Sequence, residues 1–378
     1  MTPTLDPILN AAAEGRASDV HLTAGAAAQM RVDGDLAPVP GFAEPLPAAW
    51  LEAAIDRILS PGQREDFAAA GEVDLSYTSP GLGRFRVNVF RQVGQMAVAL
   101  RFISTTVSTL EKLGAPAVCR DLALKPRGLV LVTGPTGSGK STTLTAMVDI
   151  INTTLPAHII TVEDPIEFQH QSKRSLIHQR EIGSDTASFA EALRRILRQD
   201  PDVILIGELR DQESIHTALS AAETGHLVLS TLHTQGAAKS INRIVDVFPS
   251  HQQDQIRTQL GDTLQGIISQ SLLPLAQRKG RTIATEVLVN TPAVANLIRE
   301  AQIGQLYSAM QAGSALGMHT LDQDLKRLVE AGTVSQAVAK TYAADPKSLD
   351  DVRVRPADLD AEAWSMHAGE RQLSGWGS

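Results

Sequence analysis

The chain has 378 residues and a formal net charge of -8; 43% of the residues are hydrophobic and 4% are aromatic. At roughly 150 residues per domain, this length predicts two or three domains. The charge leaves no excess of cations to displace counterions from DNA, and the aromatic content argues against a stacking platform for single strands. We therefore expect no direct nucleic-acid binding, and a DNA helicase is the weaker hypothesis.

The sequence has one cysteine, Cys119, which excludes an intrachain disulfide and a multi-cysteine zinc site. We expect this residue to be a small buried hydrophobe. No segment reaches the roughly 18 consecutive apolar residues of a spanning helix, and Asp6 and Glu14 stand where a signal peptide would be basic and then apolar. We expect no transmembrane segment and a cytoplasmic protein whose membrane contact is peripheral.

The first hundred residues combine strand and helix patterns and predict an α+β domain over 1–103. A stretch rich in Ser, Thr, Gly and Pro follows and is the predicted interdomain linker, 104–115. Alternation of apolar and polar residues, or apolar periodicity, supports each element. Strands are predicted at 18–22, 30–34, 83–92 and 96–103, and a helix at 48–59.

Three arginines stand in the last two of these strands. Arg84 and Arg86 share one face because side chains alternate along a strand, and Arg101 lies near the end of the next strand. Charges on a strand are by default a solvated edge. The sharper interpretation is an anion site offered to a neighbouring subunit, which would couple catalysis to assembly.

From Gly128 onward, short apolar runs alternate with helical segments. Strands are predicted at 129–132, 159–162, 203–206 and 227–230, and a helix follows Ser188, which has a capping-box spacing to Glu191. Fully apolar strands that alternate with helices indicate a parallel sheet covered on both faces. We place this α/β domain at 116–280.

The run GPTGSGKST fits the P-loop pattern G-x-x-x-x-G-K-[ST] and lies between a predicted strand and a predicted helix. We expect Lys140 to reach the β- and γ-phosphates, Ser141 to hold Mg²⁺, and Thr142 to assist at the α-phosphate. A glycine-rich turn with a solvated lysine is the alternative, which the flanking strand and helix disfavour. The predicted nucleotide-binding residues are Gly134, Pro135, Thr136, Gly137, Ser138, Gly139, Lys140, Ser141 and Thr142.

Acidic residues follow two of the buried strands, where open α/β sheets place their ligands. Glu163 and Asp164 follow 159–162, and Glu208 follows 203–206, with Gly207 in the place where a metal-binding Asp usually ends the strand. Carboxylates there can orient a water or hold Mg²⁺, whereas helix capping is the alternative for each taken singly. His226 and His233 bracket the strand at 227–230; each is either a structural residue or a sensor of phosphate.

After Arg281 the pattern becomes mostly helical, and we expect a helical C-terminal subdomain over 281–345. The remainder, 346–378, has little apolar periodicity and mixes acidic residues with Pro, Gly and Ser. Such a composition predicts a flexible tail.

Several runs in the same order resemble the PilT-type twitching-motility ATPases of the secretion ATPase superfamily. They are RGLVLVTGPTGSGKSTTL, HIITVEDPIEF, DPDVILIGELRD, AETGHLVLSTLHT and IVDVFPS. The resemblance extends from ASDVHLTAG near the N-terminus to TLDQDLKRLVEAG near residue 332.

This resemblance implies a hexameric ring whose subunits join a PAS-like domain to a RecA-like ATPase domain and use ATP and Mg²⁺ to retract type IV pili. It implies a partner, the inner-membrane platform protein, and peripheral association with that membrane through the pilus machine. By resemblance, 134–142 is the Walker A loop, Glu163 activates water, Glu208 is the Walker B carboxylate, and His226 and His233 form the His box. Arg84, Arg86 and Arg101 fall where family members supply arginines to the nucleotide.

Two features depart from the retraction motors. The chain reads AVANLIRE where they read AIRNLIRE, so Ala295 replaces an arginine and alters a surface of the apparatus, and the tail is longer. The tail is similar to that of the accessory PilU-type paralogue. The alternatives are therefore an accessory retraction ATPase that works with a paralogue, a secretion or DNA-uptake ATPase, and a ring that binds nucleotide but hydrolyses it poorly.

Overall fold

The computed structural model describes residues 3–32, 34–103, 106–277 and 280–354, which form two compact units. The first unit comprises Met1–Thr106 with two later segments, Asp164–His170 and Glu181–Asp185. The second comprises the rest of the chain from Val107. Residues 104 and 105 of the predicted linker lie outside the described residues, as does Asp33 in the predicted strand 30–34.

The first unit contains a six-stranded sheet in the order β3-β2-β1-β6-β5-β4, and its paired strands are antiparallel. The strands and the helix predicted in this region are confirmed. The pattern did not identify β3, β4 or two of the three helices. The elements are α1 (Asp6–Glu14), β1 (Asp19–Thr23), β2 (Gln29–Val32), β3 (Asp35–Pro38), α2 (Ala48–Asp56), α3 (Pro61–Ala70), β4 (Glu72–Ser79), β5 (Gly83–Gln92) and β6 (Gln95–Phe102).

One hydrophobic core joins the helices of this unit to its sheet. Ile8 of α1 and Leu51 of α2 belong to the same buried cluster as Phe85, Val87 and Leu100 of the strands. Phe85 and Val87 alternate with Arg84 and Arg86 along β5, because successive side chains of a strand face opposite sides. The two arginines therefore lie on the face of β5 that is turned away from this core.

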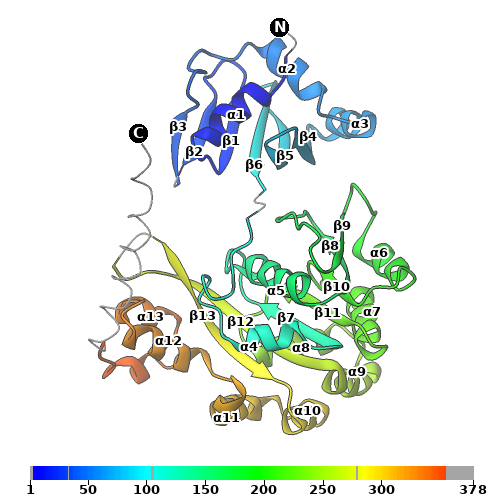
Figure 1. Ribbon diagram of the computed structural model, residues 1–378, viewed down its shortest axis with the longest axis vertical. Helices are drawn as coiled ribbons and strands as arrows, with labels where there is room; N and C mark the ends of the chain where they lie inside the picture. The colour runs from blue at the N-terminus through cyan, green and yellow to red at the C-terminus, as the bar shows by residue number, and fades with distance from the viewer. Residues whose placement is uncertain (1–2, 33, 104–105, 278–279, 355–378) are drawn as a thin grey trace, which may run out of the picture. The chain divides into compact units, whose positions relative to one another are not determined.

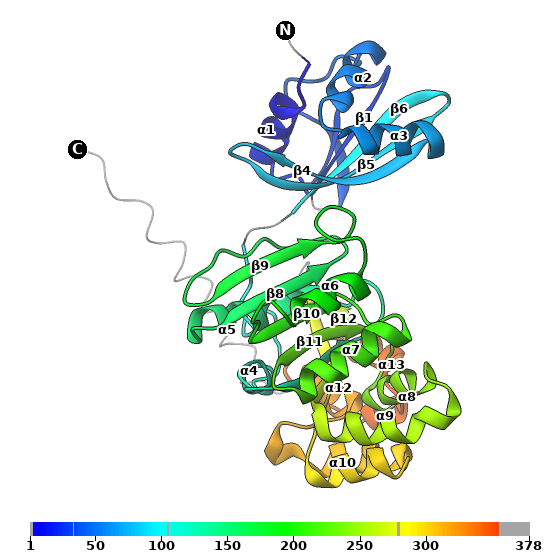
Figure 2. The same cartoon turned by 90° about the vertical axis from the view of Figure 1, so that its right-hand side faces the viewer.

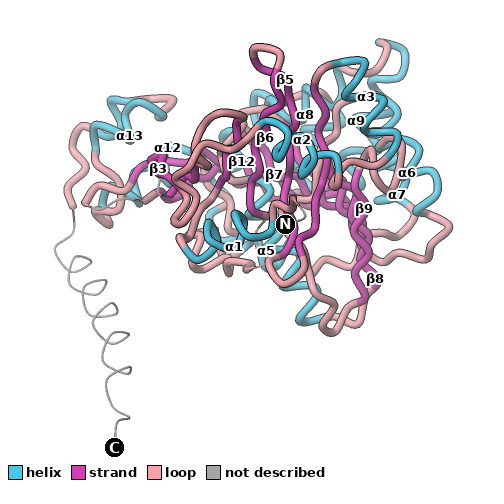
Figure 3. Tube along the Cα trace, turned by 90° about the horizontal axis from the view of Figure 1, so that it is seen from above, coloured by secondary structure: helices cyan, strands magenta, loops and turns pink. Residues whose placement is uncertain are grey.

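The second unit contains a seven-stranded sheet in the order β13-β12-β7-β11-β10-β8-β9. The predicted strands at 129–132, 159–162, 203–206 and 227–230 are confirmed, and they pair in parallel. The edge strand β9 lies beside β8 (Figure 3). The strands are β7 (Gly128–Thr133), β8 (His158–Glu163), β9 (Leu176–Glu181), β10 (Val203–Ile206), β11 (Leu227–Leu232), β12 (Leu264–Pro274) and β13 (Arg281–Val289).

Two expectations for this unit need correction. The sheet is not wholly parallel, because β13 pairs antiparallel with β12 over nine residues on each strand. The region from Arg281 therefore starts with a strand rather than a helix. The paired segments, Gly266–Pro274 and Arg281–Val289, form a long hairpin of mixed composition, and their apolar residues are too irregularly spaced to give a clear strand signal.

Helices cover both faces of the parallel strands (Figures 1 and 2). On one face, Leu144 and Met147 of α5 share a core with Val130 and Val132 of β7 and with Cys119. Helices α6 and α7 contact β8, β7 and β11 outside that cluster. Cys119 is fully buried, as predicted, and burial raises the pKa of its thiol to about 12. The helices are α4 (Val118–Ala123), α5 (Lys140–Thr154), α6 (Phe189–Ile196), α7 (Gln212–Glu223), α8 (Ala237–Asp246) and α9 (Ser250–Thr263).

Of the two hydrogen bonds of the predicted capping box at the start of α6, one is present. The Ser188 hydroxyl accepts a hydrogen bond from the Glu191 amide at 3.2 Å. The Glu191 carboxylate does not return to the Ser188 amide; it pairs instead with Arg195 one turn later, at 2.9 Å. A charged partner on the same helix therefore competes successfully for this side chain.

The C-terminal region packs four helices beside the β12–β13 hairpin. Ala295 is 7% exposed, and its carbonyl oxygen lies against Gly261 of α9, so the departure from the family pattern lies in a helix interface and not on a surface. Leu349 is fully buried, at the start of the predicted tail; 355–378 lies outside the described residues. The helices are α10 (Pro292–Arg299), α11 (Leu306–Ala312), α12 (Leu321–Glu330) and α13 (Gln336–Tyr342), and the 3-10 turns are η1 (Ile303–Gln305), η2 (Ser314–Leu316) and η3 (Pro346–Leu349).

Candidate nucleotide-binding site

The glycine-rich loop connects the end of β7 to the start of α5, in the predicted strand–loop–helix arrangement. Gly134, Gly137 and Gly139 all have positive φ angles, of 142°, 79° and 87°. Such angles favour glycine, since it has no Cβ to meet the neighbouring carbonyl oxygen. The loop therefore presents bare backbone at a helix N-terminus, which suits an anion.

Lys140 is the first residue of α5, and its side chain folds against this loop. The ammonium Nζ donates to the carbonyl oxygens of Gly134, at 3.0 Å, and Pro135, at 3.1 Å. Ser141 and Thr142, which follow in the first turn, are partly exposed, whereas Ser138 is buried. The loop thus brings one cation and two accessible hydroxyl groups to the same helix end.

The sheet order places the other predicted groups of this unit along one edge. Strands β7, β11, β10 and β8 are parallel neighbours, so the segments after their last residues emerge together. The glycine loop follows β7, His233 follows β11, and Glu208 follows β10. Glu163 is the last residue of β8.

His233 connects Glu208 to the glycine loop. Its Nε2 lies 3.4 Å from the Glu208 Oε1, and its Nδ1 lies 3.3 Å from the hydroxyl oxygen of Thr136. The other carboxylate oxygen of Glu208 accepts a hydrogen bond from Arg210 Nε at 2.7 Å. Each oxygen of the Glu208 carboxylate therefore has a partner. The His233 ring lies between this carboxylate and the glycine loop and is close to both.

Neutral donors orient Glu163. Its Oε1 accepts hydrogen bonds from the Thr161 hydroxyl, at 2.6 Å, and from the Gln179 amide, at 3.1 Å. Thr161 precedes it by two residues on the same face of β8, and Gln179 comes from β9. Gln179 was not identified from the sequence, because β9 reads LIHQRE and has no apolar pattern that marks a buried strand. Thr161 lies inside a predicted strand, but no pattern marks its hydroxyl as a partner of Glu163.

His226 does not join this edge within one chain. It precedes β11, and the register pairs Leu227 with Gly128 at the start of β7. Six residues of strand, about 20 Å, separate it from the loop after Thr133. Its Nδ1 lies 3.0 Å from the Ala221 carbonyl oxygen, which places the ring at the end of α7. Within one subunit, His226 therefore lies away from the loop, and its predicted contact with nucleotide stays a prediction.

The three predicted arginines belong to the first unit, and two of them form ion pairs there. Arg84 pairs with the Glu181 carboxylate at 2.9 Å, and that carboxylate also accepts hydrogen bonds from Ser76 Oγ, at 2.5 Å, and the Ile166 amide, at 3.1 Å. Glu181 is 3% exposed. Arg84 is therefore one of several donors to a buried carboxylate.

Arg101 and Arg86 are directly opposite each other on β6 and β5. Arg101 donates to Asp19 at 2.7 Å. Partial burial raises the pKa of Asp19, but the hydrogen bonds from Arg101 and Ser18 outweigh it and hold the pKa below its usual value. Arg86 is exposed and makes no ion pair with the residues that the structure describes.

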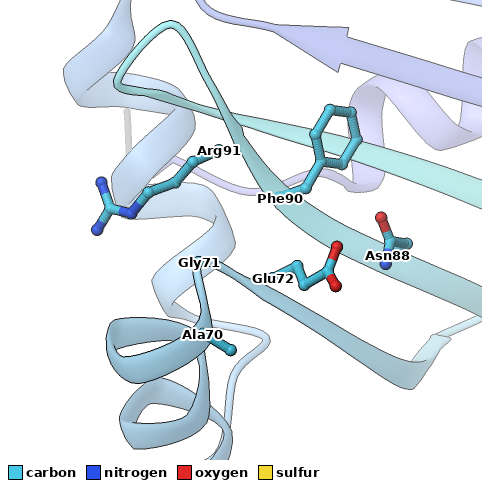
Figure 4. Close-up of a pocket in the computed structure, with 6 residues that line it drawn as sticks. All are labelled: Ala70, Gly71, Glu72, Asn88, Phe90 and Arg91. Atoms are coloured by element: carbon cyan, nitrogen blue, oxygen red, sulfur yellow. The ribbon is translucent and has the colours of Figure 1, made fainter.

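A hollow of about 510 Å³ lies in the first unit at the junction of α3 with β4 and β5 (Figure 4). In Figure 4 the side chains of Glu72 and Arg91 diverge. The Arg91 guanidinium instead lies over the ring of Phe67, 5.0 Å from its centroid. Because its charged groups do not converge, this hollow lacks the geometry of a catalytic site. Its lining is Ala70, Gly71, Glu72, Asn88, Phe90 and Arg91.

Across 3–32, 34–103, 106–277 and 280–354, we find no helix with the length and apolar character needed to cross a bilayer. The same ranges contain no group of three or more His, Cys, Asp or Glu side chains arranged for a metal ion.

Comparison with known proteins identifies the family. Residues 1–347 match the model of the type II/IV secretion system protein family. The chain is 49% identical to the "Type IV pilus retractation ATPase PilT" of Pseudomonas aeruginosa, over 90% of this chain and 98% of that protein. It is 40% identical to the "Type IV pilus ATPase PilU" of the same organism, over 91% and 90% of the two chains.

A solved structure agrees with these relatives. The crystal structure of the pilus retraction motor PilT with bound ADP has a TM-score of 0.85 and 46% sequence identity, and the match covers 91% of this chain and 98% of that one. The chain therefore belongs to the type II/IV secretion system protein family and, within it, to the PilT-type ATPases.

Proposed function

We propose that this chain is an ATP-hydrolysing motor that retracts type IV pili. The observation that carries the proposal is 49% identity to a pilus retraction ATPase along 98% of that protein. The grouping of the glycine loop, Glu208 and His233 at one edge of the sheet supports it from the site. Retraction is thus inferred from similarity, and ATP hydrolysis from both similarity and geometry.

The residues of the glycine loop suit a nucleotide polyphosphate. The loop offers backbone amides at a helix N-terminus, and Lys140 supplies the cation. The buried Ser138 hydroxyl has no hydrogen-bond partner among the described residues, which supports a polar ligand there. ADP in the similar PilT structure supports the same assignment. The nucleotide-binding residues that we propose are Gly134, Pro135, Thr136, Gly137, Ser138, Gly139, Lys140, Ser141 and Thr142.

The site also suits Mg²⁺. A hydroxyl from Ser141 and a carboxylate from Glu208 are the hard oxygen donors that this ion prefers, and few protein ligands are needed when substrate phosphates and waters complete the shell. When bound, Mg²⁺ neutralises charge that develops on the transferred phosphoryl group.

Within one subunit, Glu163 is the residue that we assign to the attacking water. Its carboxylate accepts hydrogen bonds from Thr161 and Gln179, which hold it at the carboxyl end of β8, on the same edge of the sheet as the glycine loop. Glu208 and His233 lie where they can respond to a movement of the glycine loop. In the assembly, the residues that we assign to the nucleotide of a neighbouring subunit are His226, Arg84, Arg86 and Arg101.

The assembly that we propose is a homohexamer associated with the inner membrane through the platform protein of the pilus machine. Its subunits would combine a PAS-like domain over 1–103 with a RecA-like domain over 116–280 and a C-terminal subdomain over 281–345. The parallel strands β7, β11, β10 and β8, with helices on both faces, support the RecA-like layout.

An accessory, PilU-like motor is the second candidate. The departure at Ala295 and the long tail favour it, because both depart from the main retraction motors. The identity to PilT, 49%, exceeds that to PilU, 40%, over similar lengths and favours a PilT-like motor. A secretion or DNA-uptake ATPase is the third candidate.

Steady-state turnover tests the catalytic part. The purified chain should hydrolyse ATP with Mg²⁺, and Glu163→Gln should reduce kcat at least 100-fold, in line with the loss of a general base. Glu52→Gln, an exposed change on α2, is the matched control. Equal turnover of the wild type and Glu163→Gln would contradict the assignment.

Complementation tests the biological part. The chain is expressed alone in cells that lack every retraction ATPase, and pilus dynamics are recorded by microscopy. Retraction by the chain alone supports an independent motor, whereas retraction that requires a co-expressed PilT supports the accessory motor. Full ATPase activity without retraction in either background would contradict both and favour the secretion ATPase.

A further inference from the structure

Gln270 of β12 joins the glycine loop to α5 through a buried amide. The residue is 1% exposed. Its Nε2 donates to the backbone carbonyl oxygen of Ser138 at 2.7 Å, and its Oε1 accepts from the Thr143 hydroxyl at 3.0 Å. One side chain from a neighbouring strand therefore fixes both the last turn of the loop and the first turn of the helix.

Gln270 also packs closely against the loop, with both its backbone and its side-chain amide. A Cβ atom at position 134 would lie 2.3 Å from the Gln270 carbonyl oxygen, and one at position 139 would lie 3.2 Å from its Nε2. The loop and β12 thus touch at Gly134 and Gly139 with no side chain of the loop between them. Because the approach is so close, a change in the position of β12 displaces the loop.

A neutral amide is the side chain that this position requires. Ser138 offers an acceptor and Thr143 a donor, so the buried side chain must donate at one end and accept at the other. A carboxylate cannot donate to the Ser138 carbonyl. Methionine has a similar volume but leaves both partners unsatisfied, and buried unsatisfied groups weaken the arrangement that holds them.

The preceding residue of β12 holds the segment that follows His233. Ser269 Oγ accepts a hydrogen bond from the Gly236 amide at 2.8 Å, and Glu286, opposite Ser269 on β13, accepts one from the Ala237 amide at 2.7 Å. Successive residues of a strand face opposite sides. Two adjacent positions of β12 therefore hold two different segments, one on each side of the strand. Gln270 holds the glycine loop, and Ser269 holds the segment that follows His233.

We propose that Gln270 is a positioning residue for nucleotide: its amide fixes the Ser138 carbonyl and thereby aligns the backbone amides of the glycine loop with the phosphates. This inference rests on the proposed function only in taking the loop as the phosphate site. Gln270 touches the loop and not the reacting atoms. Its loss therefore weakens nucleotide binding more than it slows the chemical step.

The test compares Gln270→Met with Gln199→Met, the same change at an exposed position of the second unit. We measure ADP affinity by calorimetry, KM for ATP and kcat, with circular dichroism and thermal unfolding as folding checks. Gln270→Met should weaken ADP binding and raise KM about tenfold, with a change in kcat of less than about threefold. Unchanged ADP affinity and KM in a folded Gln270→Met would overturn the inference.

Two further variants keep the test decisive if Gln270→Met does not fold. Thr143→Val removes the donor to Oε1 but leaves Nε2 on Ser138, so it should weaken ADP binding by about threefold or less. At a pH that keeps the new side chain ionised, Gln270→Glu should weaken binding more than any neutral substitution, since the carboxylate cannot donate to Ser138 and adds negative charge beside a phosphate site. Equal ADP affinity of Gln270→Glu and wild type would overturn the inference.

The outcome is distinguishable from failure of the proposed function. If the wild-type chain binds ADP but does not hydrolyse ATP, the motor proposal fails, and the effect of Gln270→Met on ADP affinity still tests the positioning role.

Discussion

Glu208 and His233 come from the ends of neighbouring parallel strands, and their side chains meet at 3.4 Å. The other ring nitrogen of His233 reaches Thr136 in the glycine loop. A substitution at His233 should therefore remove the connection between the Glu208 carboxylate and the loop without removing either of them.

The two histidines that bracket β11 form a natural pair for testing this relationship. We expect His233→Gln to lower kcat for ATP hydrolysis about tenfold or more, because a positioned group beside the phosphate loop is lost. His226→Gln, at the opposite end of the same strand, should leave kcat within about twofold in the isolated subunit. Steady-state assays measure both, and an equal loss for the two variants would contradict the separation seen here.

Two glycines of the loop differ in what surrounds them. Both Gly134 and Gly137 have positive φ, so alanine strains the backbone at each by about 1–2 kcal/mol. A Cβ at Gly134 would also collide with the Gln270 carbonyl oxygen, whereas one at Gly137 would meet nothing within 4 Å. Gly134→Ala should abolish ADP binding in calorimetry, and Gly137→Ala should weaken it by less than Gly134→Ala does. Equal affinities of the two variants would show that the close contact with β12 is unimportant.

The buried pair of Arg84 and Glu181 should act as a unit. Breaking a buried ion pair leaves an uncompensated charge, so Arg84→Met and Glu181→Gln should each lower the free energy of unfolding by about 3 kcal/mol. The double variant should lose much less than the sum of the two. Urea unfolding measures all four proteins, and additive losses would contradict a direct pair.

Arg101→Met is the control for that cycle, because Arg101 is 68% exposed in its pair with Asp19 and such pairs contribute about 0–1 kcal/mol. The cycle also tests the role of Arg84. If Arg84 serves a nucleotide and not Glu181, Arg84→Met should leave the free energy of unfolding unchanged.

His319 should make the protein less stable in acid. Burial lowers the pKa of this histidine, although Asp324 and a hydrogen bond to Gly317 oppose the shift. Its Nε2 lies 2.9 Å from the Thr285 hydroxyl. As the pH falls below the ordinary value of 6.5, the unfolded chain takes up a proton that the folded protein resists, so stability decreases until the lower folded pKa is passed.

Thermal unfolding between pH 7.5 and 5 checks this expectation. The melting temperature of the wild type should fall over that range more steeply than that of His319→Gln, which cannot take up the proton. His216→Gln, an exposed change on α7, should behave like the wild type. Parallel curves for all three proteins would contradict the effect.

The parts of the fold that the sequence predicts are those with a simple local pattern. Strands β7, β8, β10 and β11 are short runs of mostly apolar residues, and the P-loop pattern needs no information beyond eight consecutive residues. The β12–β13 hairpin mixes polar and apolar residues, and its strands are recognised only by pairing with each other and with β7. Local periodicity therefore misassigned the region after Arg281.

The candidate site divides in the same way. Lys140, Glu163, Glu208 and His233 could be named because motifs and strand ends locate them. Gln179 and Gln270 could not, because each acts through a partner distant in sequence; Gln270 lies 132 residues from Ser138. An isolated glutamine has no pattern, and its importance depends on what tertiary folding brings beside it.

The hairpin of β12 and β13 has a mechanical consequence. Gln270 is opposite Thr285, and β13 ends only four residues later, about 14 Å along the strand, just before α10. Hydrogen bonds between the two strands stiffen this hairpin along its length. A displacement of α10 should therefore be transmitted to the glycine loop. Helix α10, which departs from the family pattern at Ala295, thus lies at one end of a hairpin that contacts the glycine loop through Gln270.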